Sequence, residues 1–198
     1  MKLSIDKALS DLTEEERLRL LDRRPTDEPL LKPQVGEILD RVKKEGDGSL
    51  LAMAEEFDRV RLPALEVPRD RWDEALAGLD PNLREDLREA AKNIEIFHAA
   101  QIPEEVQVTV RPGVTLGRRA VPLSVVGVYA PGGRAAYPSS VLMGVVPAVT
   151  AGVETVVLCS PPGPSGLPPA EVLAAAAIGG ASRVFAIGGA GAIGAMAY

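Results

Sequence analysis

Residues 125–160, VVGVYAPGGRAAYPSSVLMGVVPAVTAGVETVVLCS, decide the fold of this chain. The valine-rich run at 125–129 is typical of a buried strand, and the loop APGGRAAYP (130–138) follows it. Residues 139–151 then predict an apolar helix, and residues 155–159 predict a second strand. A strand, a helix and a strand joined by short loops predict two parallel strands in one sheet.

The same unit repeats towards the end of the chain. A Pro-rich loop precedes a helix predicted over residues 170–179, a strand over 183–187 and a helix that starts at Ala190. This repeat indicates an α/β fold, with a helical amino-terminal region followed by an incomplete Rossmann-like parallel-sheet domain.

Two glycine-rich loops follow predicted strands of this sheet. They are Pro131-Gly132-Gly133 and Gly188-Gly189. Ligands of parallel sheets lie beyond the carboxyl ends of the strands. Glycine lets a backbone approach a phosphate closely, and a helix that starts just beyond offers unpaired amides. Each loop is therefore a candidate anion or cofactor contact.

The residues before the sheet predict helices and one hairpin. Thr13 and Glu16 form a T-x-x-E capping box in a helical arm, residues 1–25. Further helices are predicted over 31–44, from Ser49 as cap to about Phe57, over about 70–78, and over 81–100 with Asp80 as N-cap. In the helix after Ser49 we expect Leu50, Met53, Ala54 and Phe57 to face inwards. In the helix over 81–100 a helical period is kept by Leu83, Leu87, Ala90, Ala91, Ile94 and Phe97. Alternating valines from 106, a Pro112-Gly113 turn and a second alternation at 114–116 predict a β-hairpin. We expect three parts: the arm 1–25, a first domain over 26–121 and a cofactor domain over 122–198.

Composition excludes several classes of protein. The net charge of −6 argues against nonspecific nucleic-acid binding, which needs a basic surface. Residues 121–198 hold four charged side chains, Arg134, Glu154, Glu171 and Arg183, although 25% of the whole chain is charged. The longest uncharged run there, 135–153, contains Pro138 and Pro147, which favours a covered parallel sheet over a membrane span. A lone cysteine and the lack of an apolar leader segment predict a cytoplasmic protein without internal disulfides.

Gly189, Gly191 and Gly194 match G-x-G-x-x-G, the pattern of dinucleotide-binding turns. The match follows the third predicted strand instead of the first, and no acidic residue follows it in this chain. Two interpretations remain open, a dinucleotide site and tight packing of a helix on a sheet.

Other candidate residues favour structural roles. His98 lacks the partners that a zinc site needs, so we expect a hydrogen-bonded structural histidine. Cys159 is expected to be a small buried hydrophobe, because no basic partner is near it in sequence. Ser139 and Ser140 are expected to cap the helix after the first glycine loop, where a hydroxyl also faces any ligand. Trp72 is expected in the core or at an interface.

The sequence closely resembles the histidinol dehydrogenases. The resemblance is carried by VPLSVVGVYAPGGRAAYPSSVLMGVVPAVTAGVETVVLCSPP (121–162) and VLAAAAIGGASRVFAIGGAGAIGAMAY (172–198). It extends to VGEILDRVKKEGDGSLLAMAEEFD (35–58), AAKNIEIFHAAQIP (90–103) and the RPGV turn (111–114). The Y-x-P-G-G loop and its A-Y-P-S-S continuation are highly specific, and the resemblance covers essentially the whole chain.

The resemblance implies an NAD-dependent, zinc-dependent enzyme of histidine biosynthesis. Members of the family oxidise L-histidinol to L-histidine in two steps through a bound aldehyde, as homodimers with Rossmann-like domains. Their pattern implies an NAD contact at Tyr129 and another after the second Gly-Gly, where the family has a glutamine and this chain has Gly191. We expect the following cofactor-binding residues: Tyr129, Gly132, Gly133, Ser139, Gly188, Gly189 and Gly191.

The resemblance places the remaining machinery of the family outside this sequence. The zinc ligands (a glutamine, two histidines and an aspartate) and the acid–base Glu-His pair belong to the family's carboxyl-terminal half, which also completes the sheet of the first domain. We therefore expect this chain to be the amino-terminal part of a histidinol dehydrogenase, with no catalytic or metal residue of its own and no turnover alone. The alternative is a non-catalytic remnant that binds a nucleotide or mediates dimerisation.

Overall fold

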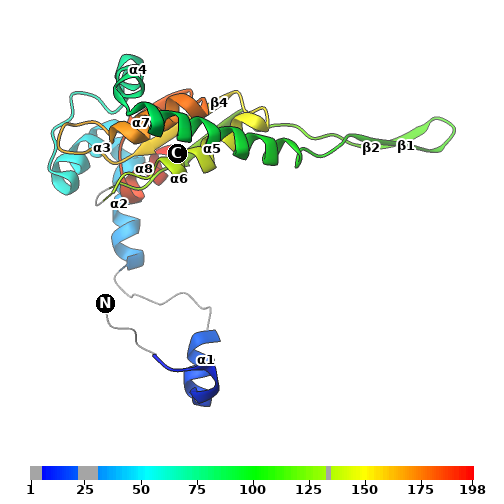
Figure 1. The fold of residues 1–198 in the computed structure, drawn as a ribbon, viewed down its shortest axis with the longest axis horizontal. Helices are drawn as coiled ribbons and strands as arrows, with labels where there is room; N and C mark the ends of the chain where they lie inside the picture. Colours follow the sequence, from blue (N-terminus) through cyan, green and yellow to red (C-terminus); the bar gives the residue numbers. More distant parts are fainter. Residues whose placement is uncertain (1–5, 22–30, 133–134) are drawn as a thin grey trace. The chain divides into compact units, whose positions relative to one another are not determined.

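The computed structural model describes residues 6–21, 31–132 and 135–198, which Figure 1 traces. The chain divides into two compact units, 1–34 and 35–198, and each is described by itself. The predicted domain boundaries after residues 25 and 121 stay a prediction.

The larger unit begins with helices. They are α2 (Leu31–Glu45), which starts in the smaller unit, α3 (Asp47–Met53), α4 (Arg69–Gly78) and α5 (Pro81–Ala99). A π-helical turn, Ala54–Asp58, extends α3. The predicted cap of α5 is confirmed, because the Asp80 carboxylate accepts hydrogen bonds from the amides of Asn82 (2.9 Å) and Leu83 (3.2 Å). The predicted cap at Ser49 is wrong. α3 begins two residues earlier, and the Ser49 hydroxyl donates to the Gly46 carbonyl from inside the helix (2.8 Å).

The predicted hairpin is confirmed. β1 (Val106–Arg111) pairs antiparallel with β2 (Val114–Arg118), and Val108 lies opposite Leu116. The hairpin extends away from the helices and the parallel sheet (Figure 1). Every residue of its strands is exposed except the half-buried Val114.

The predicted α/β fold is confirmed. β3 (Val125–Tyr129), β4 (Thr155–Ser160) and β5 (Arg183–Ala186) form a parallel sheet in the order β3-β4-β5. α6 (Pro138–Thr150) connects β3 to β4, α7 (Ala170–Gly179) connects β4 to β5, and α8 (Gly189–Ala197) follows β5. Three strands in sequential order form one half of a doubly wound sheet.

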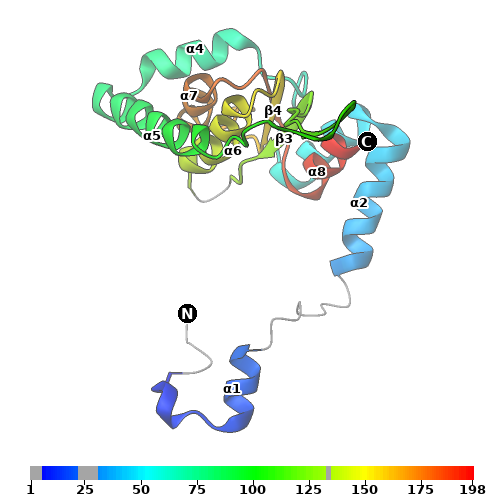
Figure 2. The same cartoon turned by 90° about the vertical axis from the view of Figure 1, so that its right-hand side faces the viewer.

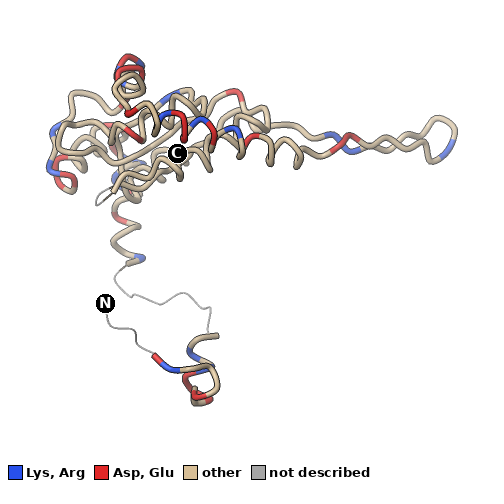
Figure 3. The backbone as a smooth tube through the Cα atoms, in the orientation of Figure 1, with Lys and Arg blue, Asp and Glu red and all other residues tan. Residues whose placement is uncertain are grey.

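The sheet lies between two layers of helices. Neighbouring residues of β3 show this, because Gly127 lies against Met196 of α8 whereas Val128 lies against Gly144 of α6. Figure 2 shows the strands with α6 and α7 on one side and α8 on the other. α4 and α5 pack outside α7 and α6. Charged residues gather on the helices of the first half of the chain and are scarce over the sheet (Figure 3). The two-layer cover therefore accounts for the apolar composition of residues 121–198.

Three residues of these apolar helical patterns lie at the surface: Phe57, Phe97 and Leu83, which is 36% exposed. Phe57 is 55% exposed, because the π-helical turn adds a residue to the last helical turn and rotates the ring off the buried face of Leu50 and Met53. Phe97 is 63% exposed, because the last turn of α5 runs towards the hairpin and not over the sheet. Trp72 is confirmed as a core residue, and its indole donates to the Val67 carbonyl (3.0 Å).

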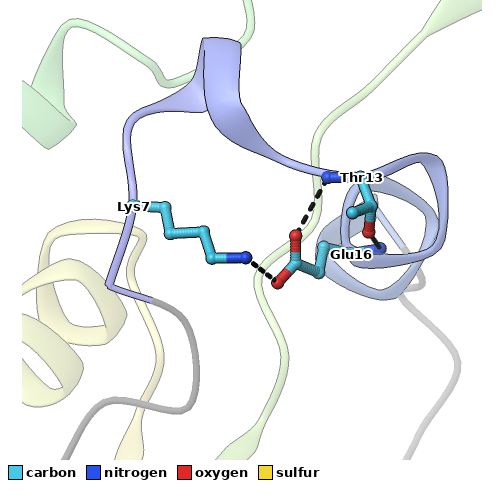
Figure 4. Close-up of polar contacts among 3 residues, drawn as sticks. All are labelled: Lys7, Thr13 and Glu16. Atoms are coloured by element: carbon cyan, nitrogen blue, oxygen red, sulfur yellow. Dashed lines mark hydrogen bonds and ion pairs between the residues drawn. The ribbon is translucent and has the colours of Figure 1, made fainter.

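The smaller unit contains a 3₁₀ turn, Leu9–Asp11, and α1 (Glu14–Leu21). Figure 4 shows the predicted capping box of α1. The Thr13 amide donates to Glu16 (2.9 Å), the Glu16 amide donates to the Thr13 hydroxyl (3.2 Å), and Lys7 pairs with the same carboxylate (2.7 Å). The hydrogen bond from Lys7 is the main cause that lowers the pKa of Glu16.

No helix in the described ranges is both long enough and apolar enough to cross a bilayer. The uncharged run 135–153 forms α6 and its flanks, and α6 packs on α5, α7 and the sheet.

Candidate functional site

The loops at the carboxyl ends of β3, β4 and β5 meet around one proline. A Cβ atom added to Gly188 would lie 2.7 Å from Cγ of Pro161, and one added to Gly132 would lie 3.2 Å from its Cδ. Pro161 directly follows β4, so its ring lies between the loop after β3 and the loop after β5. Glycine at 188 is required because the rigid ring leaves no room for a side chain. The structure therefore brings the two predicted glycine loops together.

A hydrogen bond ties the first and third strands at this edge. The Gly189 amide donates to the Tyr129 hydroxyl, with 3.1 Å between nitrogen and oxygen. Gly189 has φ +61°, a left-handed conformation that favours glycine, and a Cβ there would meet no atom within 4 Å. The backbone of the β5–α8 turn is thus open on the side that faces away from the protein.

The first turn of α8 offers further donors. The first intrahelical bond joins the Ala192 amide to the Gly188 carbonyl (3.2 Å). Within the part of the chain that the structure describes, the amides of Ala190 and Gly191 have no acceptor. Unpaired amides at a helix start favour a phosphate or another anion.

A cavity of about 200 Å³ lies beside this turn. Its wall is largely apolar, and it is formed by the helices before the sheet and by the glycine loop: Ile38, Leu50, Met53, Ala54, Phe57, Asp58, Pro161 and residues 187–191. Phe57 offers an exposed ring, and Asp58 offers a half-buried carboxylate whose pKa is raised by burial. Sequence reasoning missed both as site residues, because only the π-helical turn places them here. It also missed Pro161, although a proline two residues after the predicted strand 155–159 was a usable signal.

The three glycines of G-x-G-x-x-G serve different purposes. Gly189 shapes the open turn, whereas Gly191 and Gly194 face the helices before the sheet. A Cβ on Gly191 would lie 3.1 Å from the sulfur of Met53, and one on Gly194 would lie 2.8 Å from Cδ2 of Leu39. Close packing of α8 on α2 and α3 thus accounts for the second and third glycines. Gly191 also lines the cavity, and its role in cofactor binding stays a prediction.

The predicted Ser139 lies on the first turn of α6 and is exposed. The prediction that Ser139 and Ser140 cap this helix is wrong. The helix begins at Pro138, Tyr137 is its N-cap, and no side chain caps it. The Ser140 amide donates to the Tyr137 carbonyl (3.1 Å), so both serines lie inside the first turn. Gly133 lies outside the described residues.

Cys159 is a buried small hydrophobe, as predicted. It is 1% exposed at the end of β4, and desolvation raises the pKa of its thiol to about 12. Such a thiol is a poor nucleophile because its thiolate form is scarce near neutral pH.

His98 lies away from the glycine loops. Its ring contacts Phe97 edge-on, with 5.4 Å between ring centroids, and it lines another cavity with Gln101 and Pro122. Across residues 6–21, 31–132 and 135–198, no three His, Cys, Asp or Glu side chains are grouped so that they could share a metal ion.

Comparison with known proteins places this geometry in one family. The family model of histidinol dehydrogenase matches residues 21–198. Histidinol dehydrogenases from Methanosarcina barkeri and Halobacterium salinarum are 45% and 46% identical over 100% and 97% of this chain, which covers 46% and 44% of those proteins. The crystal structure of histidinol dehydrogenase from Elizabethkingia anophelis matches 84% of this chain with a TM-score of 0.79 at 35% identity, and 38% of that chain is covered. The chain thus spans about half the length of the curated relatives it matches. On this agreement of sequence and fold, the chain belongs to the histidinol dehydrogenase family.

Proposed function

We propose that this chain is the amino-terminal part of an NAD-dependent, zinc-dependent L-histidinol dehydrogenase. The whole enzyme would oxidise L-histidinol to L-histidine through L-histidinal in histidine biosynthesis, as a cytoplasmic homodimer. The function of this part would be to hold NAD at the carboxyl edge of the parallel sheet. The observation that carries the proposal is the Tyr129–Gly189 hydrogen bond, which fixes an open glycine turn beside a cavity.

The described residues fit a dinucleotide. Free amides at the start of α8 suit a diphosphate, the apolar wall with Phe57 suits a flat ring, and Asp58 suits a hydroxyl donor. Sites for whole drug-sized ligands occupy roughly 300–1,000 Å³. The cavity of about 200 Å³ therefore fits one portion of NAD, and the rest would lie along the open loops after β3 and β5.

The proposed contacts with NAD follow from these positions. The set comprises Tyr129, Gly132, Gly133, Ser139, Gly188, Gly189 and Gly191. When bound, NAD supplies the acceptor for the hydride that leaves the substrate. Tyr129 would position the β5–α8 turn, and Gly188 and Gly189 would present backbone to the cofactor without side chains between them. Pro161 would keep the two loops at a fixed separation.

The described residues do not fit a zinc site, because no group of three potential ligands lies together in them. No step through zinc is assigned to this chain. We expect the 198-residue chain to bind NAD without oxidising L-histidinol, because removal of the hydroxyl proton requires a positioned base.

Binding and turnover can be measured separately on the purified chain. Isothermal titration with NAD reports binding, and NADH absorbance in the presence of L-histidinol reports oxidation. The expected result is saturable NAD binding without NADH formation, and Tyr129→Phe should weaken binding about three- to tenfold because one hydrogen bond is lost. A chain that binds no NAD would contradict the cofactor site. A chain that forms NADH would show that turnover does not need the residues beyond this half of the family.

A further inference from the structure

A cavity of about 720 Å³ lies between the segment that precedes α4 and the loop that follows β4. Three arginines line it, Arg59, Arg61 and Arg71, together with the carboxylate of Glu66. We call it the arginine cavity. It shares no lining residue with the cavity beside α8. Sites for small organic ligands occupy roughly 300–1,000 Å³, so the arginine cavity has room for a whole ligand.

The chain itself does not neutralise the positive charge of the arginine cavity. Glu66 accepts two hydrogen bonds from Arg183, which does not line the cavity. The side chains of Arg59 and Arg61 form no ion pair or hydrogen bond within the described residues. The neighbouring carboxylate of Asp58 lines the cavity beside α8, and the shift of its pKa comes from burial and not from an arginine. A cavity of net positive charge, in a chain of net charge −6, indicates a site for an anion.

Arg71 adds donors from α4. Its guanidinium donates to Glu74 at 3.1 Å, and both side chains are exposed. A guanidinium has five N–H groups, and this contact uses one of them. Surface ion pairs of this kind contribute little to stability, so the pair does not prevent Arg71 from binding an anion in the cavity.

Hydrogen bonds hold the backbone on both sides of the arginine cavity. Residues 65–67 pair with β5 through two bonds of 2.8 Å. The loop after β4 is closed by a bond from the Gly163 amide to the Leu167 carbonyl, also 2.8 Å. A Cβ atom on Gly166 would lie 3.4 Å from Cδ2 of Leu62, so this loop packs against the segment that carries the arginines. A cavity formed in advance lowers the entropic cost of binding.

The uncharged part of the lining indicates what kind of anion fits. Val60, Val67, Pro164 and Leu167 contribute apolar surface, which an inorganic ion would leave unused. A ligand with a charged group and an organic body would contact both parts of the lining. A phosphate ester carries a charge of about −1.5 to −2 at neutral pH and offers three strong acceptor oxygens, which suits several guanidinium groups at once.

We propose that the arginine cavity binds a phosphate ester of a small organic molecule. Arg59, Arg61 and Arg71 hold the phosphate, and the organic body lies against the apolar wall. The site is additional to the proposed cofactor site and does not depend on it.

The test is isothermal titration of the 198-residue chain with phenyl phosphate and, separately, with inorganic phosphate. The double variant Arg59→Gln/Arg61→Gln removes two charges, and glutamine keeps a side chain on the left-handed backbone of residue 59, where φ is +61°. The matched control is Arg111→Gln/Arg119→Gln, which removes two exposed arginines that do not line the cavity. Circular dichroism confirms that each variant folds.

Phenyl phosphate should bind at one saturable site and more tightly than inorganic phosphate. Arg59→Gln/Arg61→Gln should weaken this binding about tenfold or more, the size of at least one charge-assisted hydrogen bond, while the control stays within about twofold of the wild type. Three results would each overturn the inference: no saturable binding, equal affinity for the ester and the inorganic ion, or equal loss in the variant and its control.

A titration in saturating NAD separates this site from the cofactor site. The affinity for phenyl phosphate should not change, because the two cavities share no lining residue. If NAD displaces phenyl phosphate, the ester occupies the cofactor site, so the inference is wrong and the proposed function stands. If the chain binds phenyl phosphate at the arginines but binds no NAD, the proposed function fails and the inference stands.

Discussion

The β1–β2 hairpin and the β3–β4–β5 sheet are built from the same kind of sequence and have opposite surroundings. Both are rich in valine, which favours extended backbone. In the hairpin Val108 and Leu116 face each other and are 53% and 59% exposed, whereas Val156 and Leu158 of β4 are buried. The difference is the cover, because helices lie on both faces of the sheet, whereas no helix in the described part of the chain lies on the hairpin. Valine-rich segments favour the pairing of strands in both places. The free energy gained by burying apolar side chains, however, comes only from the helices that cover the sheet.

The same difference decides where a ligand can bind. At the carboxyl edge of the sheet, helix packing fixes the ends of three strands within contact of one another, and the loops there form a cavity. The hairpin has a turn with Gly113 at positive φ, but no second layer surrounds it within the described residues. The candidate ligand site therefore lies at the helix-covered sheet and not at the hairpin.

The largest effect should come from truncation of the sheet core. Leu158→Ala should lower the free energy of unfolding by about 2–5 kcal/mol, because it leaves a cavity between β4 and its covering helices. Leu116→Ala makes the same chemical change on the hairpin and should cost less than about 0.5 kcal/mol. Urea unfolding of both variants measures the difference. Equal losses would show that the hairpin is covered in solution.

The next effect concerns the contact at Pro161. Gly188→Ala places a methyl group against a rigid ring, so it should cost about 1–3 kcal/mol and weaken NAD binding by moving the turn. The matched control is Gly48→Ala in α3, where an added methyl group meets nothing within 4 Å. That change should be neutral or stabilising, because alanine favours a helix. Thermal unfolding with and without NAD separates the two effects, and wild-type stability of Gly188→Ala would refute the close contact.

Most of the fold could be predicted from the sequence because its local signals are strong. The period of two in the hairpin, the apolar runs of the sheet and the Asp80 cap each locate an element within one or two residues. The predictions that Ser49 caps a helix and that Phe57 points inwards were wrong for a different reason. Gly46 is the N-cap of α3, so the helix begins before Ser49. The π-helical turn at the other end of α3 changes the direction in which the last side chains point. The spacing of apolar residues in the sequence reveals neither feature.

The site was predicted in part. The two glycine loops were found because glycine marks both a close approach and a positive φ, and the structure joins them at Pro161. Phe57 and Asp58 could not be found from the pattern near the loops, because they come from a segment about 130 residues earlier in the chain, brought there by packing of α3. A G-x-G-x-x-G match also could not show that two of its glycines face other helices.

A smaller effect should distinguish two sources of stability for α5, the helix between the sheet and the hairpin. One source is its N-terminal cap, and the other is its packing on neighbouring helices. Asp80→Ala removes the cap that binds two amides and should cost about 1 kcal/mol. Asp86→Asn, at an exposed position of the same helix, controls for the loss of charge. Helix content by circular dichroism and urea unfolding measure the change. A cost for Asp80→Ala no larger than that for Asp86→Asn would show that packing on α6 and α7 holds α5 without its cap.

The smallest effect concerns the edges of the sheets. The edge of β5 is covered by residues 65–67, through bonds from the Val67 amide to Val184 and from the Ala186 amide to Leu65, both 2.8 Å. Arg183 strengthens this cover by donating two bonds to the Glu66 carboxylate, at 2.8 and 2.6 Å, which lowers the pKa of Glu66. The strands of the hairpin have no such cover in the described chain.

A carboxyl group with a lowered folded-state pKa stabilises the fold above its unfolded value, near 4.5 for glutamate, and the gain is lost as the pH falls through the folded value. Because both side chains are about half exposed, the gain should be less than about 1 kcal/mol and should shrink in salt. Thermal unfolding of the wild type and of Glu66→Gln should therefore differ at pH 7 and converge as the pH falls below 4.5. Glu95→Gln, at an exposed position of α5, controls for the loss of one negative charge. If the wild type and Glu66→Gln still differ in unfolding temperature in acid, the charge of Glu66 contributes nothing. Glu66 would then cover the edge of β5 through the packing of its aliphatic stem and its backbone.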